Sequence, residues 1–82
     1  MRSLENFKMA SFEEKCDLVI ANSNYITSRK IADTKIYLYH TGKFFIEVYY
    51  SSKHKKVLTI NAFDDVNGME PYADNVSLEE LA

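Results

Sequence analysis

The chain has 82 residues and a mass of 9.5 kDa, the size of one small domain. With 46% apolar and 27% charged residues, two glycines and one proline, it is not collagen-like, low-complexity or wholly disordered. Its net charge is −2, and no apolar run approaches the roughly 18 residues that a membrane helix needs. The first residues, which include Arg2 and Lys8, have no apolar signal region, and a single cysteine, Cys16, fits a reducing compartment. We therefore expect one cytoplasmic domain over residues 1–82.

A helix is predicted to begin after Ser11. The sequence Ser11-Phe12-Glu13-Glu14 has the form of a capping box, in which the first side chain caps the helix and the last reaches back to it. Apolar residues then recur at helical spacing, and this stripe is expected to face the core: Phe12, Cys16, Val19 and Ile20. Residues 1–10 either add a turn through Leu4 and Phe7 or fray.

From Tyr25 onward the apolar pattern alternates, and β-branched and aromatic residues dominate. This predicts four strands with a turn at Ala32-Asp33 after the first: Tyr25 to Ile31, Lys35 to His40, Lys43 to Tyr50 and Lys56 to Phe63. The even-numbered residues of the last three are mostly aliphatic, so we expect them to share one core face. That places Leu38 opposite Ile46, Ile36 opposite Val48, Val48 opposite Leu58 and Ile46 opposite Ile60, while the register of the first strand stays open.

Beyond Phe63 the alternation stops in a polar loop over residues 64–68. Glu70-Pro71 is predicted to open a short helix, and the Ser77 to Glu80 segment repeats the capping-box pattern. The predicted fold class is therefore α+β, with an N-terminal helix packed on a four-stranded antiparallel meander and followed by short C-terminal helical turns.

Three segments also resemble a group of short bacterial proteins that have an "FFVEVYY"-type central strand. The likeness covers roughly residues 25–81 and rests on Tyr37-Leu38-Tyr39 with Phe44 to Tyr50, on an "ITIxAF"-like strand at Leu58 to Phe63, and on "EPYxxxxxLEEL" at Glu70 to Leu81. The group has no known activity, so the resemblance implies the fold and brings no catalytic residues.

No residue pattern in the sequence points to catalysis. His40 and His54 have no ligand partner at metal-binding spacing, Cys16 lies on the apolar stripe, and Asp64-Asp65 belongs to an exposed loop. Glu47 is the unusual carboxylate, because it lies in mid-strand among aromatic residues. Burial could raise its pKa, or it could hydrogen-bond to neighbouring tyrosines or face water. We expect a protein that is not an enzyme and that has no metal site and no cofactor.

Charge is unevenly distributed along the chain. Residues 29–56 carry seven basic and two acidic side chains, whereas residues 57–82 carry six acidic and no basic ones. A basic, tyrosine-rich sheet is typical of single-stranded nucleic-acid binding, for which the candidate contacts are Arg29, Lys30, Lys35, Lys53, Lys55 and Lys56. The acidic total and a pI near 5.6 argue against this alternative.

One face of the predicted sheet is aromatic, and it gives the leading hypothesis. If alternation holds, a single helix layer covers the other face and leaves this one exposed, as protein-interaction surfaces are. The candidate interface, bordered by Val57 and Thr59, consists of Tyr37, Tyr39, Phe45, Glu47 and Tyr49. We therefore predict an interaction module that forms a homodimer or binds another protein. The alternative is that Leu4 and Phe7, or the C-terminal turns, fold over this face.

Overall fold

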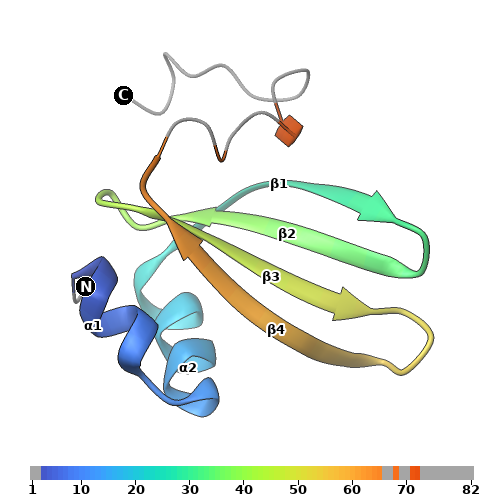
Figure 1. Cartoon of the computed structure of the whole chain (residues 1–82), viewed down its shortest axis with the longest axis horizontal. Coiled ribbons are helices and arrows are strands. Elements are labelled where there is room, and N and C mark those ends of the chain that lie inside the picture. The colour runs from blue at the N-terminus through green and yellow to red at the C-terminus, as the bar shows by residue number, and fades with distance from the viewer. Residues whose placement is uncertain (1–2, 66–67, 69–70, 73–82) are drawn as a thin grey trace.

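In a computed structural model the chain is described at residues 3–65, 68, 71 and 72. Two helices precede four strands (Figure 1): α1 (Leu4–Met9), α2 (Phe12–Asn22), β1 (Asn24–Ile31), β2 (Thr34–His40), β3 (Phe45–Ser51) and β4 (Lys56–Phe63). The strands form one antiparallel sheet in the order β1-β2-β3-β4, each strand paired with the next. The predicted α+β class and the meander topology are confirmed.

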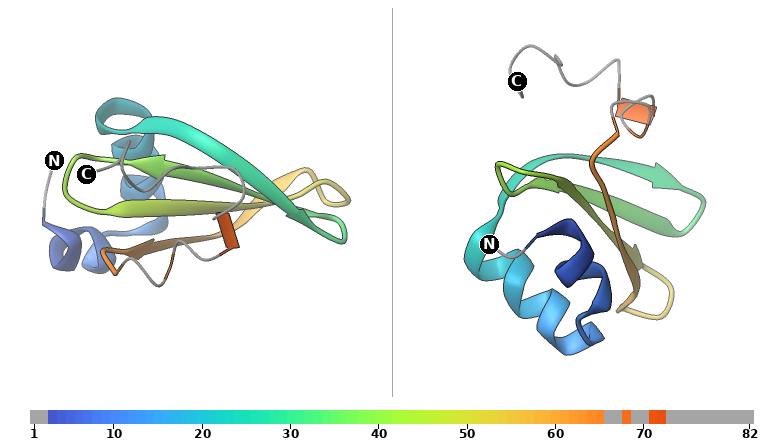
Figure 2. Two further views of the ribbon diagram at one scale, coloured as in Figure 1. Left: turned by 90° about the horizontal axis from the view of Figure 1, so that it is seen from above. Right: turned by 60° about the vertical axis from the view of Figure 1, so that its left-hand side comes forward.

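Both helices begin at a serine cap. The Ser11 hydroxyl accepts a hydrogen bond from the Glu14 backbone N–H at 3.1 Å, and Ser3 caps α1 in the same way through Asn6. The N-terminal segment therefore forms a helix instead of fraying. Figure 1 and Figure 2 show the two helices together on one side of the sheet, where they pack mainly against β4.

The helix side of the sheet holds the larger core. Its buried members are Phe7, Val19, Phe44, Ile46, Ile60 and Ala62, and the rings of Phe7 and Phe44 lie 5.5 Å apart. The predicted apolar stripe of α2 is only partly buried. Val19 is inside, but Phe12 is 48% and Ile20 is 83% exposed. The expectation was wrong for these two residues, because a short helix beside a small sheet buries a narrow strip only.

The register of β2 against β3 differs by one residue from the prediction. Leu38 lies opposite Glu47 and Ile36 opposite Tyr49, so the even-numbered aliphatic residues of β2 do not share a face with Ile46. The cause is a longer connection, in which the Thr41 hydroxyl accepts hydrogen bonds from the backbone N–H groups of the two residues at the end of the turn. A slip of one residue moves every side chain of a strand to the other face.

The pairing of β3 with β4 is displaced by two residues. Val48 lies opposite Ile60 and Ile46 opposite Ala62, so the parity was right and the partners were wrong. An irregularity between Tyr49 and Tyr50 absorbs one extra residue of β4. The first strand, whose register was open, pairs Arg29 with Ile36.

The sheet therefore has buried residues on both sides. On the side away from the helices a second cluster joins Leu38, Phe45 and Tyr72, all less than a tenth exposed. Pro71 and Tyr72 form part of a helical turn, as the Glu70-Pro71 pattern predicts. The turn predicted to begin at Ser77 lies outside the described residues.

Candidate interaction surface

The structure divides the predicted aromatic face between the two sides of the sheet. Tyr37 and Tyr39 lie on the helix side, because they pair with Val48 and Ile46. Phe45, Glu47 and Tyr49 lie on the other side, and Phe45 and Glu47 are only 9% and 5% exposed. The five residues do not form one surface, so the predicted interface is corrected. The error follows directly from the one-residue difference in the β2–β3 register.

Glu47 is the centre of a buried polar cluster. Tyr72 donates its hydroxyl to Glu47 Oε2 at 2.6 Å, and the Asn61 side chain donates to Oε1 at 3.1 Å. Two longer contacts come from the Tyr49 hydroxyl to Oε1 at 3.4 Å and from Arg29 Nη2 to Oε2 at 3.5 Å. Both carboxylate oxygens are thus satisfied, which is the condition for keeping a charge in an apolar setting.

The cluster also raises the pKa values of two of its tyrosines. Burial, and then the hydrogen bond to Glu47, raise the pKa of Tyr72 far above its ordinary value, and burial raises the pKa of Tyr49. Arg29 lies over the Tyr72 ring, 5.3 Å from its centroid. The cluster therefore holds the chain at Tyr72 against β3. Arg29, one of the predicted nucleic-acid contacts, pairs with Glu47 through Nη2 in this cluster.

Tyrosines gather instead on the helix side, where the helices leave the sheet uncovered. The Tyr25 ring lies 5.8 Å from that of Tyr39 and 6.3 Å from that of Tyr37, and Tyr25 is 55% exposed. Tyr50 lies opposite Lys35, whose ammonium group is 5.2 Å from the Tyr37 ring. We call this surface the open face and define it by Tyr25, Tyr37, Tyr39 and Tyr50. Burial raises the pKa of Tyr39 above its ordinary value.

An apolar groove of about 190 Å³ borders the open face along α2. It is lined by Cys16, Val19, Ile20, Tyr39, Val48, Val57 and Ile60. Cys16 is a half-buried free thiol in this wall, in keeping with its predicted packing role. Together with the highly exposed Ile20, the groove extends the open face with apolar surface.

The predicted basic residues other than Arg29 come together at one end of the sheet. The turn between β1 and β2 touches the turn between β3 and β4, where the Ser52 N–H donates to the Asp33 carbonyl at 2.9 Å. This end, which we call the hairpin end, lies away from the helices in Figures 1 and 2. It carries the exposed lysines Lys30, Lys35, Lys53, Lys55 and Lys56.

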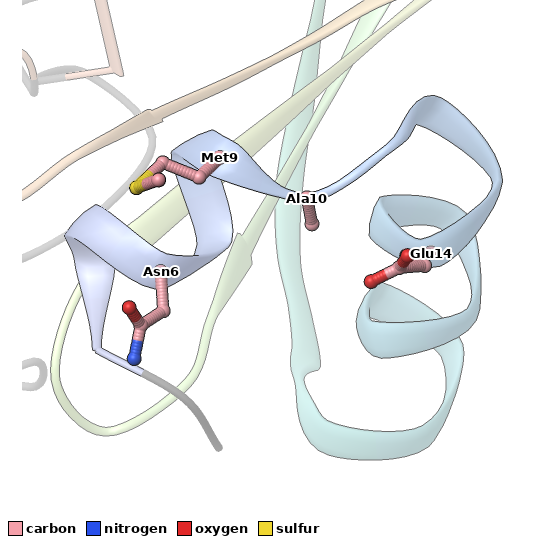
Figure 3. A pocket seen from close by; sticks show the side chains of 4 residues that line it. All are labelled: Asn6, Met9, Ala10 and Glu14. Carbon is pink, nitrogen blue, oxygen red and sulfur yellow. The ribbon is translucent and has the colours of Figure 1, made fainter.

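The two histidines lie in different parts of the fold, one in β2 and one in the turn between β3 and β4. His40 packs its ring 4.6 Å from that of Phe45, and His54 is exposed in a turn. Across residues 3–65, 68, 71 and 72, no three metal-ligating side chains come together. A hollow of about 340 Å³ lies where α1 meets α2. It is lined by Asn6, Met9, Ala10 and Glu14 (Figure 3). It offers one carboxylate and one amide, without a nucleophile beside them.

Comparisons with known proteins give no relative. No protein-family model matches the chain, and neither a curated protein nor a solved structure is significantly similar to it. Among the described helices, none is both long and apolar enough to span a bilayer.

Two residues of these surfaces were not found from the sequence. Tyr72 is 25 residues from Glu47 along the chain. The sequence left open that the C-terminal turns cover this face and that tyrosines bond to Glu47, but it did not single out Tyr72. Tyr25 was assigned to a strand whose register was open, so the face it occupies was unknown. Their placement depends on long-range pairing, which local sequence patterns do not encode.

Proposed function

We propose that this protein is a non-enzymatic interaction module that self-associates through the open face. The observation that carries the proposal is the packing of Tyr37 and Tyr39 against an exposed Tyr25, next to an apolar groove and an exposed Ile20. Tyrosine supplies large contact area with few rotatable bonds and is enriched at protein interfaces. A contiguous apolar and aromatic patch on a small protein is typical of a surface that binds another molecule.

The size of the domain supports the same proposal. A chain of this length buries only about 60–65% of the surface that its unfolded form exposes, so its intrinsic stability is modest. Small domains often gain stability by burying a further apolar surface in an oligomer. The side of the sheet away from the helices already has its cover at Leu38 and Phe45 from Tyr72, which leaves the open face as the available surface.

Replacement of Tyr25 by lysine tests the proposal. Tyr25 is more than half exposed, so the Tyr25→Lys chain should fold, yet its charge would be buried in the assembly. We expect sedimentation equilibrium to show weaker association, with a dissociation constant raised at least about 100-fold. Phe45→Lys is unsuitable because Phe45 is buried and the variant would unfold.

The matched control is Thr59→Lys. Thr59 is exposed on β4, the edge strand opposite the β1 edge that holds Tyr25, and its pairing with Tyr49 places it on the other side of the sheet. This substitution adds the same charge to an exposed strand position and should leave the assembly unchanged. Equal effects of Tyr25→Lys and Thr59→Lys, or no effect of Tyr25→Lys, would contradict the proposed surface.

Single-stranded nucleic-acid binding is the second candidate function. It is favoured by the five lysines at the hairpin end and by the Tyr37 ring beneath Lys35. The net negative charge and the engagement of Arg29 with Glu47 weigh against it. Salt-sensitive retention of a labelled single-stranded oligonucleotide at about 50 mM salt would support it, and no retention would exclude it.

A further inference from the structure

The shape and charge of the helix side together indicate which partner fits the open face. We propose that the occupant is a second copy of this chain, related by a two-fold axis that runs across the strands. In this arrangement the helices of each copy lie against the hairpin end of the other. The inference rests on the proposed function and adds to it the orientation of the partner.

The helices cover one end of the sheet only. In Figures 1 and 2, α1 and α2 stand beneath the end where β4 finishes, while both hairpin turns project beyond them at the other end. The helix side is therefore stepped, with a raised block at one end and an open platform at the other. Two such surfaces fill each other when one is reversed end for end, because each block then occupies the platform of its partner. A two-fold axis gives both contacts at once, as isologous interfaces require.

The helices expose apolar side chains that such a contact would bury. Met9 is 84%, Phe12 is 48% and Ile20 is 83% exposed, although the last two belong to an apolar stripe at helical spacing. Exposure of large apolar residues on a helix is costly unless something covers them. The platform offers suitable cover in the rings of Tyr37 and Tyr50, which lie on the same side of the sheet nearer the hairpin end.

The distribution of charge also favours the reversed arrangement of the two copies. The helices carry four carboxylates against two lysines, Lys8 and Lys15, and the carboxylates are those of Glu5, Glu13, Glu14 and Asp17. The hairpin end carries five lysines against Asp33. A parallel arrangement would place like charges together, whereas the reversed one places each acidic block against a basic platform.

The sheet itself contains an unfavourable pair that the partner would relieve. Lys30 lies directly opposite Lys35 in the β1–β2 register, and like charges at paired positions are destabilising. Both side chains are exposed on the open side of the sheet. Carboxylates from a partner helix would convert this repulsion into attraction.

Charge reversal tests the orientation. A hairpin variant carries Lys30→Glu and Lys35→Glu, a helix variant carries Glu13→Lys and Asp17→Lys, and a swapped variant carries all four. Each reversal occurs twice in a two-fold dimer, so we expect each double variant to raise the dissociation constant by about tenfold or more. The dissociation constant of the swapped variant should return to within about threefold of that of the unaltered chain, because its acidic and basic surfaces are again complementary. Circular dichroism of every variant establishes that folding is retained.

Carbodiimide crosslinking of a mixture of ¹⁵N-labelled and unlabelled chains reads the contacts directly. We expect mixed-isotope crosslinks that join the lysines of the hairpin end to the carboxylates of the helices. One outcome overturns the orientation and leaves the proposed function standing. In it, Tyr25→Lys disrupts the dimer, but these crosslinks are absent and the swapped variant does not regain the affinity of the unaltered chain. A monomer at all concentrations overturns both. Salt-sensitive binding of a single-stranded oligothymidine that the hairpin variant loses also overturns this proposal, because the same lysines would then contact phosphates.

Discussion

Removal of the Tyr72 hydroxyl is the most direct perturbation of the buried cluster. Tyr72→Phe keeps the ring that packs with Leu38 and Phe45 and deletes the 2.6 Å hydrogen bond to Glu47. A hydrogen bond to a charged group contributes about 1.5–3 kcal/mol, and the carboxylate left behind is 5% exposed and cannot recruit much water. We expect the free energy of unfolding to fall by about 2 kcal/mol, a large share of the total for so small a domain.

Urea denaturation, followed by circular dichroism at one low protein concentration, measures this loss. A small domain has a denaturant slope of about 1 kcal/mol per molar urea, so the midpoint should fall by about 2 M. Tyr49→Phe is the matched control, because its hydroxyl contacts the same carboxylate at 3.4 Å from a half-exposed position, and it should cost less than about 0.5 kcal/mol. A Tyr72→Phe chain within 0.5 kcal/mol of the parent, or one no less stable than the Tyr49→Phe control, would refute the reasoning.

The dependence of the free energy of unfolding on pH is a second test of the hydrogen bond between Tyr72 and Glu47. The pKa of Tyr72 is raised above its ordinary value of 10.0 in the folded chain, so the folded state retains a proton that the unfolded state releases. The stability contributed by this group is then fully present below pH 10 and is lost as pH rises further. The stability difference between the parent and Tyr72→Phe should be constant from pH 6 to 9 and shrink in more alkaline solution. A difference that grows with alkalinity would contradict the assignment.

Three further substitutions test local features. Gly68→Ala should cost about 1–3 kcal/mol, because its Cβ would overlap the Phe63 ring, and chemical denaturation measures the loss. Ala32 has a φ of 52°, so Ala32→Asn should raise the thermal midpoint by a few degrees, whereas a lower midpoint would contradict the turn geometry. Ser11→Ala removes the cap of α2 and should lower stability by about 1 kcal/mol, with a loss under 0.3 kcal/mol counting against the cap.

The order and type of the elements could be predicted from the sequence because they depend on local patterns. The alternation from Tyr25 to Phe63 indicated four strands, and the Ser11 to Glu14 segment indicated the start of α2. These signals require only neighbours within a few residues, where capping, turn chemistry and side-chain periodicity act.

Which side of the sheet each side chain occupies could not be predicted, because it depends on the register between neighbouring strands. The prediction assumed one core face, and therefore it set Leu38 against Ile46. In the structure both sides of the sheet are buried, and Leu38 belongs to the side that Tyr72 covers. Aromatic residues mostly occupy the odd positions and aliphatic residues the even positions, so both registers would pair apolar residues with apolar residues. Composition therefore does not distinguish the two registers. The choice came from the turn at Thr41 and from a partner 25 residues beyond Glu47.

The molar mass of the unaltered chain in solution tests the central claim most directly. Light scattering behind a sizing column, at two protein concentrations, separates one chain of 9.5 kDa from an assembly of two. The account predicts the mass of two chains at the higher concentration, lost on Tyr25→Lys and retained on Thr59→Lys. The mass of a single chain at both concentrations would contradict self-association through the open face.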